Sequence, residues 1–225
     1  MYSWKESDRE DIQDPLKGRY RLEAEQGYRY KSRRNCVQRV QSGKGFIVQK
    51  LYQDEDSCDN ELRIYRMLQG SELPHADIIR AEPLQLSMTW LPGKNLVEIL
   101  EEQEDSGEVN WSVWEKLVGW LIGFYQLTGL VMTDVNLRNF LWDGETGTVF
   151  GVDFEECAEG GLITTAASLA AYIQTYAPEK TPLKQEISEY ILQIFSWQLR
   201  IPFRALIQET QKQEVLLRMR RKKRI

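Results

Sequence analysis

Three polar side chains in the middle of the chain have the types and the spacing that phosphoryl transfer needs. Asn139 follows Asp134 by five residues, and Asp153 ends a short apolar segment further along the chain. An aspartate can orient an attacking hydroxyl, and an asparagine with a second aspartate can hold Mg²⁺. We therefore predict that these three residues meet at one site for phosphate chemistry.

The segment between Asn139 and Asp153 predicts a hairpin. Two apolar runs are separated there by the turn-forming residues 143–147. Before Asp134, residues 111–128 carry apolar side chains at helical spacing, which predicts a long amphipathic helix. We therefore expect one carboxylate on the loop between this helix and the hairpin, and the other just after the hairpin.

A lysine lies on the apolar face of a second predicted hairpin, nearer the N-terminus. Residues 36–51 alternate in polarity on either side of a turn at 42–45, which places Lys50 on the same face as Phe46 and Val48. An unpaired buried charge is costly, so a lysine on this face needs a partner.

The helix predicted for residues 56–69 offers that partner. Glu61 lies in what we expect to be its first turn, with Asp59 or Asn60 as the cap. The alternative is a surface lysine and a solvated glutamate, because most residues of both types are exposed.

Together these residues resemble the motifs of the protein-kinase-like superfamily. Its catalytic loop, His-x-Asp-x4-Asn, is similar to residues 132–139, and its metal motif, Asp-Phe-Gly, is similar to Asp-Phe-Glu at residues 153–155. The resemblance covers residues 37–176. It implies an α+β fold with two lobes, a small β-rich N-terminal lobe and a mainly α-helical C-terminal lobe.

The resemblance also implies the ligands and a role for each residue. ATP and Mg²⁺ would bind between the lobes. Lys50 would hold the α- and β-phosphates and pair with Glu61. Asp134 would orient the acceptor hydroxyl and take its proton, and Asn139 and Asp153 would bind the metal.

Residues 86–93, a strand followed by a Pro-Gly turn, resemble the hinge between kinase lobes. By this resemblance the carbonyl of Thr89 and the N–H of Leu91 would face the adenine edge, and Met88 would lie behind the base. A strand that ends in an ordinary turn explains the same residues equally well.

Three departures separate the chain from regulated protein kinases. Met132 replaces the histidine that braces the metal motif in the family, and residues 29–35 form a basic segment without the glycine-rich loop. Side chains of that segment could neutralise phosphates, but glycines would allow a closer backbone approach. Glu155 ends the metal motif, as in small-molecule kinases of the aminoglycoside and choline type, while the short chain resembles RIO-like kinases.

Two functions remain open from the sequence. One is an ATP-dependent kinase that transfers the γ-phosphoryl group to an unidentified hydroxyl of a small molecule or a protein. The other is a kinase-like ATP-binding or pseudokinase regulatory protein without phosphotransfer, which would act with an RNA-related partner through its basic tail. A scaffold has no chemical need for Asp134, Asn139 and Asp153 together, which favours the kinase.

Composition indicates a cytoplasmic protein of ordinary globular type. The chain has 225 residues, with one histidine and three widely spaced cysteines, which disfavours triad hydrolases, zinc sites and a disulfide frame. No apolar run reaches the ~18 residues of a membrane span.

Charge is unevenly spread along the chain. The formal net charge is -5, yet six of the last eight residues are basic, which leaves 23 basic against 34 acidic residues elsewhere. We expect nucleic acid to be attracted only by this tail. The predicted divisions are an N-terminal lobe at residues 1–88, a helical lobe at 89–217 and the basic tail at 218–225. Further predicted elements are an arm at 1–17, a first strand at 19–31 and helices at 95–104, 166–176, 184–197 and 203–218.

Overall fold

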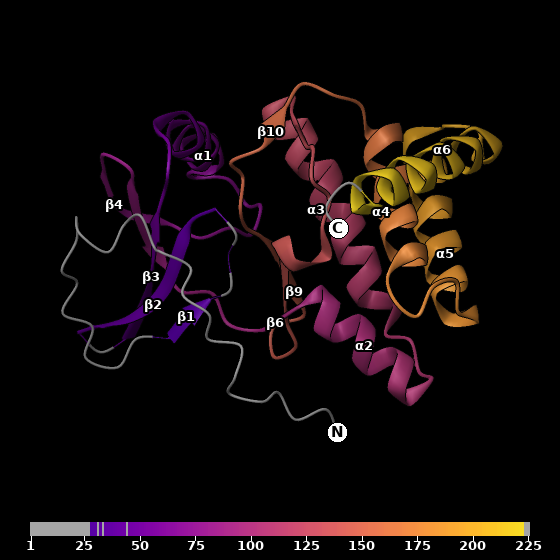
Figure 1. Ribbon diagram of the computed structural model, residues 1–225, viewed down its shortest axis with the longest axis horizontal. Coiled ribbons are helices and arrows are strands. Elements are labelled where there is room, and N and C mark those ends of the chain that lie inside the picture. The colour runs from indigo at the N-terminus through magenta and orange to yellow at the C-terminus, as the bar shows by residue number, and fades with distance from the viewer. Residues whose placement is uncertain (1–27, 31, 33, 44, 223–225) are drawn as a thin grey trace.

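The computed structural model describes residues 28–30, 32, 34–43 and 45–222. Figure 1 shows two groups of elements side by side, a sheet with one helix and a larger set of helices, with short strands between them. The predicted α+β fold with a small β-rich lobe and a mainly α-helical lobe is confirmed. Within the described residues, no helix has the length and apolar character needed to cross a membrane.

The N-terminal lobe is built on a five-stranded antiparallel sheet in the order β1-β2-β3-β5-β4. Its strands are β1 (Tyr28–Tyr30), β2 (Cys36–Ser42), β3 (Gly45–Leu51), β4 (Ile78–Glu82) and β5 (Gln85–Thr89). β2 and β3 form the predicted hairpin, and Gly43 in its turn has a φ of 57°, which glycine adopts without strain. Of the predicted first strand, the structure describes only β1. The predicted arm at 1–17 lies outside the described residues.

One helix, α1 (Glu55–Leu68), follows β3 and packs against β5 and against α3 (Trp111–Thr128) of the other lobe. Asp54 caps it, because its side chain accepts a 2.8 Å hydrogen bond from a backbone N–H of the first turn. The predicted cap at Asp59 or Asn60 is therefore wrong. Asp54 is an equally favourable cap residue and comes first along the chain. As a result, Glu61 lies in the second turn of α1.

The chain enters the helical lobe after β5. Besides α3, the helices there are α2 (Leu96–Ser106), α4 (Leu162–Thr175), α5 (Pro182–Leu199) and α6 (Phe203–Lys222). The predicted hairpin is β8 (Phe140–Asp143) and β9 (Thr148–Gly151), which form a three-stranded sheet with β6 (Lys94–Asn95). β7 (Val131–Met132) pairs with β10 (Cys157–Ala158), and the 3₁₀ helix η2 (Leu137–Asn139) leads into β8.

α3 is the central buried helix and sets the position of β9. Trp120 of α3 lies against Gly151, the last residue of β9. A Cβ atom at Gly151 would come within 2.3 Å of the Trp120 ring, so glycine allows the close approach of strand and helix. The segment that carries Asp153 therefore begins at a fixed place on α3.

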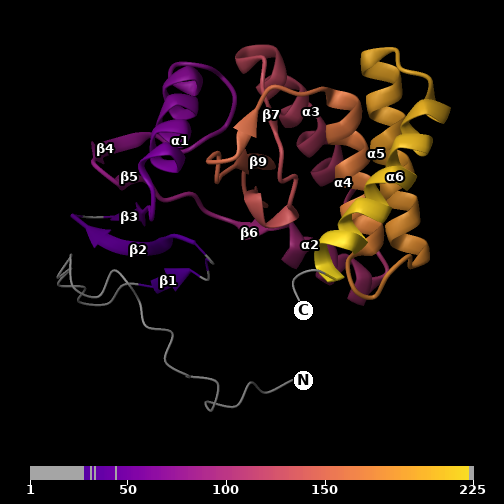
Figure 2. The ribbon, with the colours of Figure 1, turned by 45° about the horizontal axis from the view of Figure 1, so that its top comes forward.

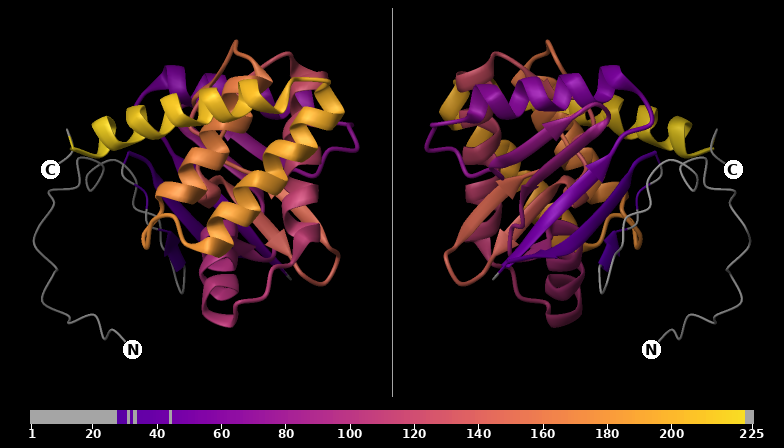
Figure 3. Two further views of the ribbon diagram at one scale, coloured as in Figure 1. Left: turned by 90° about the vertical axis from the view of Figure 1, so that its right-hand side faces the viewer. Right: turned by 90° about the vertical axis from the view of Figure 1, so that its left-hand side faces the viewer.

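α6 lies across α4 on the outside of the helical lobe (Figure 3). Residues 218–222 of the predicted basic tail form its last turn, and residues 223–225 lie outside the described part of the chain. Nη2 of Arg218 donates to Oε2 of Glu179 at 2.6 Å, and the Arg221 guanidinium donates to the Thr175 carbonyl. The described part of the tail is thus held on the helical lobe.

Candidate active site

Lys50 and Glu61 face each other in the interior of the N-terminal lobe. Nζ of Lys50, on β3, lies 2.6 Å from Oε2 of Glu61, on α1, and the two side chains are 6% and 1% exposed. The Tyr52 hydroxyl donates to the same carboxylate oxygen at 2.7 Å. The predicted pair is therefore present, and the alternative of two solvated side chains is excluded. The nucleotide role of the pair remains a prediction.

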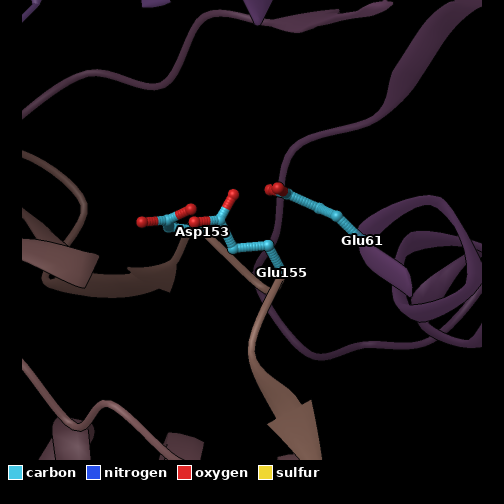
Figure 4. A group of neighbouring side chains, drawn as sticks. All are labelled: Glu61, Asp153 and Glu155. Atoms are coloured by element: carbon cyan, nitrogen blue, oxygen red, sulfur yellow. The ribbon is translucent and has the colours of Figure 1, made fainter. Parts of the chain in front are cut away.

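Two more carboxylates converge on the Lys50 ammonium from the other lobe. Asp153 accepts a hydrogen bond from Nζ, and Oε2 of Glu155 lies 3.5 Å from Nζ. Figure 4 shows these two side chains and Glu61 pointing toward one another, with oxygen atoms within 4.8 Å of each other. Asp153 has a φ of 65°, which non-glycine residues rarely adopt and which is found more often at functional sites.

The carboxylates dominate the electrostatics of this cluster. Burial lowers the pKa of Lys50, but attraction by Glu61, Asp153 and Glu155 outweighs burial and leaves the pKa well above its ordinary value. Burial raises the pKa of the Glu61 carboxyl, and the charge of Lys50 opposes that rise. The ammonium is therefore charged at neutral pH, and carboxylates outnumber it.

Phe154 anchors the segment that supplies the two carboxylates of the helical lobe. Its ring is fully buried, with its centroid 5.0 Å from that of Tyr65 on α1. On the other side it stacks on two rings of α3, Trp120 at 6.0 Å and Phe124 at 5.6 Å. Because Phe154 packs against both lobes, it fixes the neighbouring carboxylates relative to Lys50.

Asp134 and Asn139 lie on the loop between β7 and β8. Nδ2 of Asn139 donates to the backbone carbonyl of Asp134 at 3.3 Å. The carbonyl of Asn139 accepts a hydrogen bond from the N–H of Val152 at 2.9 Å, and Val152 directly precedes Asp153. The structure therefore brings the predicted catalytic loop next to the predicted metal motif. The Asp134 side chain is exposed and Asn139 is half-buried.

Backbone pairing supports the predicted metal motif beside Met132. Met132 pairs with Cys157 in the β7–β10 ladder. Next to it, the N–H of Thr133 donates to the Glu156 carbonyl at 3.3 Å, and the Thr133 hydroxyl donates to the same oxygen at 2.6 Å. The apolar Met132 therefore does not leave this segment without support.

The N-terminal lobe contacts the predicted metal motif and the residue after it through two residues of the basic segment 29–35. Nδ2 of Asn35 donates to the Glu155 carboxylate, and Arg34 forms an ion pair with Glu156. Asn35 is buried, whereas the ion pair is largely exposed and is worth ~0–1 kcal/mol. These two side chains join the lobes in this structure. Their predicted contact with phosphates remains a prediction.

The predicted hinge residues lie at the end of β5 and just beyond it. Met88 is 5% exposed and belongs to the apolar core, paired with Val48 of β3. The N–H of Thr89 donates to the Asp77 carbonyl at 2.9 Å, and Thr89 pairs with Ile47 of β3. Leu91 is half-buried in the link between the lobes. The contacts of these residues with adenine remain predictions.

Sequence analysis missed three residues of the site. Tyr52 follows Lys50 by two positions, and residues two apart in an extended segment share a side, so its contact with Glu61 could have been expected. Glu155 stands out only as a departure from the family motif. Asn60 donates to the carbonyls of Glu155 and Cys157, at 2.8 and 3.2 Å, and no sequence signal points to it.

The residues present fit a hard divalent cation. Carboxylate and amide oxygens are the side-chain ligands that Mg²⁺ prefers, and Asp153 and Asn139 supply them from adjacent segments. Within the described residues, Oε1 of the buried Glu61 has no hydrogen-bond partner, and the Asp153 side chain is 42% exposed. The cluster therefore has oxygen atoms that a cation could engage.

Comparisons with solved structures give partial matches. One is the complex of Rv3197 with erythromycin from Mycobacterium tuberculosis, with a TM-score of 0.45, 12% identity, and coverage of 69% of this chain and 52% of that chain. Another is the kinase PK-1 of Cydia pomonella granulovirus, with a TM-score of 0.48, 14% identity, and coverage of 59% and 54%. The chain thus spans about half the length of each. No protein-family model matches the chain, and neither does any curated protein. The assignment of a protein-kinase-like fold rests on the two-lobed topology and the arrangement of Lys50, Glu61 and Asp153.

Proposed function

We propose that the protein is an ATP-dependent phosphotransferase that transfers the γ-phosphoryl group of ATP to a hydroxyl. One observation carries the proposal. The Lys50 ammonium is ion-paired with Glu61 of its own lobe and with Asp153 of the other lobe. A lysine held in this way between two lobes, beside a metal motif, is the arrangement that positions the phosphates of ATP in kinases.

Each residue of the site has a distinct part in this reaction. Lys50 binds the α- and β-phosphates, and Glu61 with Tyr52 keeps its ammonium in position. Asp134 accepts a hydrogen bond from the acceptor hydroxyl and takes its proton as the new bond to phosphorus forms. Its exposed side chain, on the loop tied to Val152, is accessible to an acceptor from solvent.

Asp153 and Asn139 are the residues that would hold Mg²⁺. When bound, the metal neutralises phosphate charge and orients the γ-phosphoryl group. The direct contact between Lys50 and Asp153 supports this reading, because phosphates that draw the ammonium toward themselves leave the Asp153 carboxylate for the metal.

A second function is favoured by the contacts that join the lobes. Asn35 and Arg34 are bonded to Glu155 and Glu156, where the family has a loop that covers phosphates. A protein held closed in this way could bind nucleotide as a regulatory ligand without transferring phosphate. Both functions include ATP binding, and they differ in turnover.

Two measurements on the purified protein test the proposal. Thermal unfolding with and without millimolar Mg·ATP reports binding, since a ligand specific for the native state raises its stability. Transfer of labelled γ-phosphate to a mixed panel of sugars, amino alcohols and proteins reports turnover, with Asp153→Asn as the control. Stabilisation without transfer supports the regulatory function, and the absence of both contradicts the nucleotide site.

A further inference from the structure

Aromatic side chains and an arginine share one face of the N-terminal sheet. Arg39 of β2 lies opposite Tyr28 of β1 and opposite Val48 of β3, and residues directly opposite one another point to the same side. Phe46 lies two positions from Val48 along β3 and therefore shares that face. Tyr28 is 60% exposed and Phe46 is 41% exposed. This part of the sheet thus presents two aromatic rings to solvent beside a half-buried arginine.

Direct contacts join these side chains into one cluster. The guanidinium of Arg39 lies over the Phe46 ring, with Cζ 4.4 Å from the ring centroid, and 5.6 Å from the ring of Trp90. The rings of Phe46 and Trp90 meet edge to face at 6.0 Å. Nε1 of Trp90 donates to the Tyr30 hydroxyl at 3.3 Å, and the Tyr30 ring lies 5.1 Å from that of Tyr28. We call these five residues the aromatic platform.

The aromatic platform lies beyond the buried end of the same sheet face. Lys50 points to the same side as Phe46 and is four positions away along β3, a separation of about 13 Å for an extended strand. The Lys50 side chain is 6% exposed, whereas Phe46 is open to solvent. Figure 2 shows β1 and β2 on the side of the sheet away from α1. The aromatic platform is therefore an open surface next to the proposed phosphate site, outside the ion-paired cluster.

The segment that carries most of the aromatic platform has basic residues and no acidic ones. Residues 26–53 contain seven basic side chains, which are Arg29, Lys31, Arg33, Arg34, Arg39, Lys44 and Lys50. Removing these seven from the 29 basic residues of the chain leaves 22 against 34 acidic residues. With the ion-paired Arg34 and Lys50 set aside, the segment keeps five basic residues and no acidic one. Its charge favours an anionic ligand, although the rest of the chain is acidic.

Exposed rings beside cations fit single-stranded nucleic acid. Its bases have flat faces that stack on aromatic rings, and its phosphates are attracted by basic residues. The Arg39 guanidinium rests on Phe46 by its flat face, so the N–H groups at its edge can donate to a phosphate. A duplex offers mainly its phosphates to such a surface, because its bases are stacked inside. An acidic peptide would satisfy the charges without using the rings.

We propose that the aromatic platform binds single-stranded nucleic acid, with bases stacked on Tyr28 and Phe46 and a phosphate bound by Arg39. RNA and DNA share this chemistry, and both serve as probes below. The proposal goes beyond phosphotransfer and does not depend on it. It also differs from the expectation that nucleic acid is attracted only by the C-terminal tail.

The test measures the binding of labelled oligonucleotides to the full-length protein by fluorescence anisotropy. The probes are single-stranded RNA and DNA of about ten nucleotides, a length in the range that such a site covers, and the DNA duplex of the same sequence. We expect both single strands to bind more tightly than the duplex. Tyr28→Ala and Phe46→Ala should each weaken the binding of single strands by about tenfold, because each removes a stacking ring.

Salt dependence separates the role of the arginine from that of the rings. Arg39→Gln should lower the slope of log affinity against log salt by about 0.7, the change expected when one phosphate contact to a single strand is lost. Arg39→Lys keeps the charge and should keep the slope. Tyr28→Ala and Phe46→Ala should also keep it, because neither change removes a charge.

Matched variants control for the loss of an exposed ring or charge elsewhere. Trp197→Ala removes an 82% exposed ring from the end of α5, and Arg204→Gln removes an exposed charge from the start of α6. Both should bind the single strands as the wild type does. Arg220→Gln combined with Lys222→Gln removes two exposed charges of the tail and should also retain the wild-type affinity. Thermal unfolding confirms that each variant is folded.

Several outcomes overturn the proposal. They are equal binding of duplex and single strand, equal binding of an oligoglutamate of the same charge, or wild-type affinity in both Tyr28→Ala and Phe46→Ala. A loss of affinity in the tail variant alone would place the nucleic-acid surface at the end of α6.

Mg·ADP binding is measured separately on the same variants. If the ring variants weaken Mg·ADP binding as much as they weaken oligonucleotide binding, the aromatic platform belongs to the nucleotide site and the proposal falls. If Mg·ADP does not bind but single strands bind through the aromatic platform, the proposal stands and the proposed phosphotransferase function is contradicted.

Discussion

Nζ of Lys50 lies 2.6 Å from Oε2 of Glu61, and this contact forms within one lobe, whereas Asp153 reaches the same ammonium from the other lobe. The pair is the part of the site that the N-terminal lobe can build alone. Phosphates entering the site would compete with Asp153 for the ammonium, while Glu61 keeps its contact. We therefore expect the loss of Glu61 and the loss of Asp153 to have different effects on the site.

The first prediction concerns nucleotide binding by Lys50. Lys50→Met should strongly reduce the thermal stabilisation by Mg·ATP, because the ammonium is the cation that the phosphates meet in the N-terminal lobe. Stabilisation is measured against each variant's own ligand-free state. A ligand present at 100 times its Kd contributes about 2.7 kcal/mol, which is easily detected. Lys116→Met, an exposed lysine on α3, is the matched control and should respond as the wild type does. An unchanged response in Lys50→Met would remove Lys50 from the site.

The second prediction concerns the stability of the ion pair. Lys50→Met should lower the free energy of unfolding by ~3–5 kcal/mol, because it leaves buried Glu61 without its counter-ion. Glu61→Gln should cost less, since the ammonium keeps Asp153 and Glu155 as neighbours. The double variant should be more stable than the two single losses added together. Urea unfolding of all four proteins measures this, and strictly additive losses would show that the pair is not coupled.

The third prediction concerns Phe154. Phe154→Ala should cost ~3–5 kcal/mol, because it empties a fully buried site between rings of both lobes. Phe154→Leu keeps apolar volume and should cost less than ~1.5 kcal/mol. If Phe154 also positions Asp153, then Phe154→Leu should weaken Mg·ATP binding at nearly native stability. Native nucleotide affinity in that variant would limit Phe154 to a packing role.

The parts of the site that sequence analysis predicted depend on local periodicity. Alternation along β3 places Lys50 on the buried face, and the turn at 42–45 sets its register. Helical spacing places Glu61 on the inner face of α1 even though the predicted cap was wrong. The long helix α3 and the hairpin of β8 and β9 were also predicted, because the apolar residues of each recur at a clear helical or strand period.

The parts that were missed depend on contacts between distant segments. Glu155 reaches Lys50 across 105 positions, after a left-handed residue at Asp153 that no pattern indicates for a non-glycine side chain. From sequence alone the last turn of α6 is interpreted as a solvated basic tail, because its partners are distant in the chain, Thr175 at the end of α4 and Glu179 in the segment that follows α4. Such contacts follow from tertiary packing, and local sequence does not encode them.

The fourth prediction concerns the cysteines. Burial raises the pKa of the Cys157 thiol to about 12 and also raises that of Cys58, so neither forms the reactive thiolate at pH 8. Cys36 is half-buried. A thiol reagent should therefore label Cys36 first in the native protein, and the two buried thiols should react only on unfolding.

Cys36→Ser provides the control for that experiment and should abolish the fast phase. Raising the pH from 8 to 10 should leave Cys157 slow, because both values lie below its folded-state pKa of about 12. Three equal labelling rates at pH 8 would contradict the burial of Cys58 and Cys157.

The last prediction separates the two aspartates of the proposed site. Asp153→Asn should impair both metal-dependent nucleotide binding and turnover, because Asp153 is the carboxylate assigned to Mg²⁺. Asp134→Asn should leave Mg·ATP binding almost unchanged and reduce turnover by ~10²–10⁴, the usual range for a positioned acid or base. Asn139→Ala should resemble a milder Asp153→Asn, since Asn139 is assigned as a second ligand.

Asp143 supplies the control for a purely structural role of these aspartates. Its carboxylate accepts hydrogen bonds from the N–H of Glu145 at 3.0 Å and the Thr146 hydroxyl at 2.7 Å, so it caps the turn between β8 and β9. Asp143→Asn should lower stability only slightly, because the amide oxygen can still accept one of these hydrogen bonds, and it should leave nucleotide binding and turnover intact. Nucleotide titrations and turnover measurements on the set of variants decide the roles. If Asp134→Asn and Asp153→Asn lose nucleotide binding equally, or if either keeps full turnover, then the assignment of one to the hydroxyl and the other to the metal is wrong.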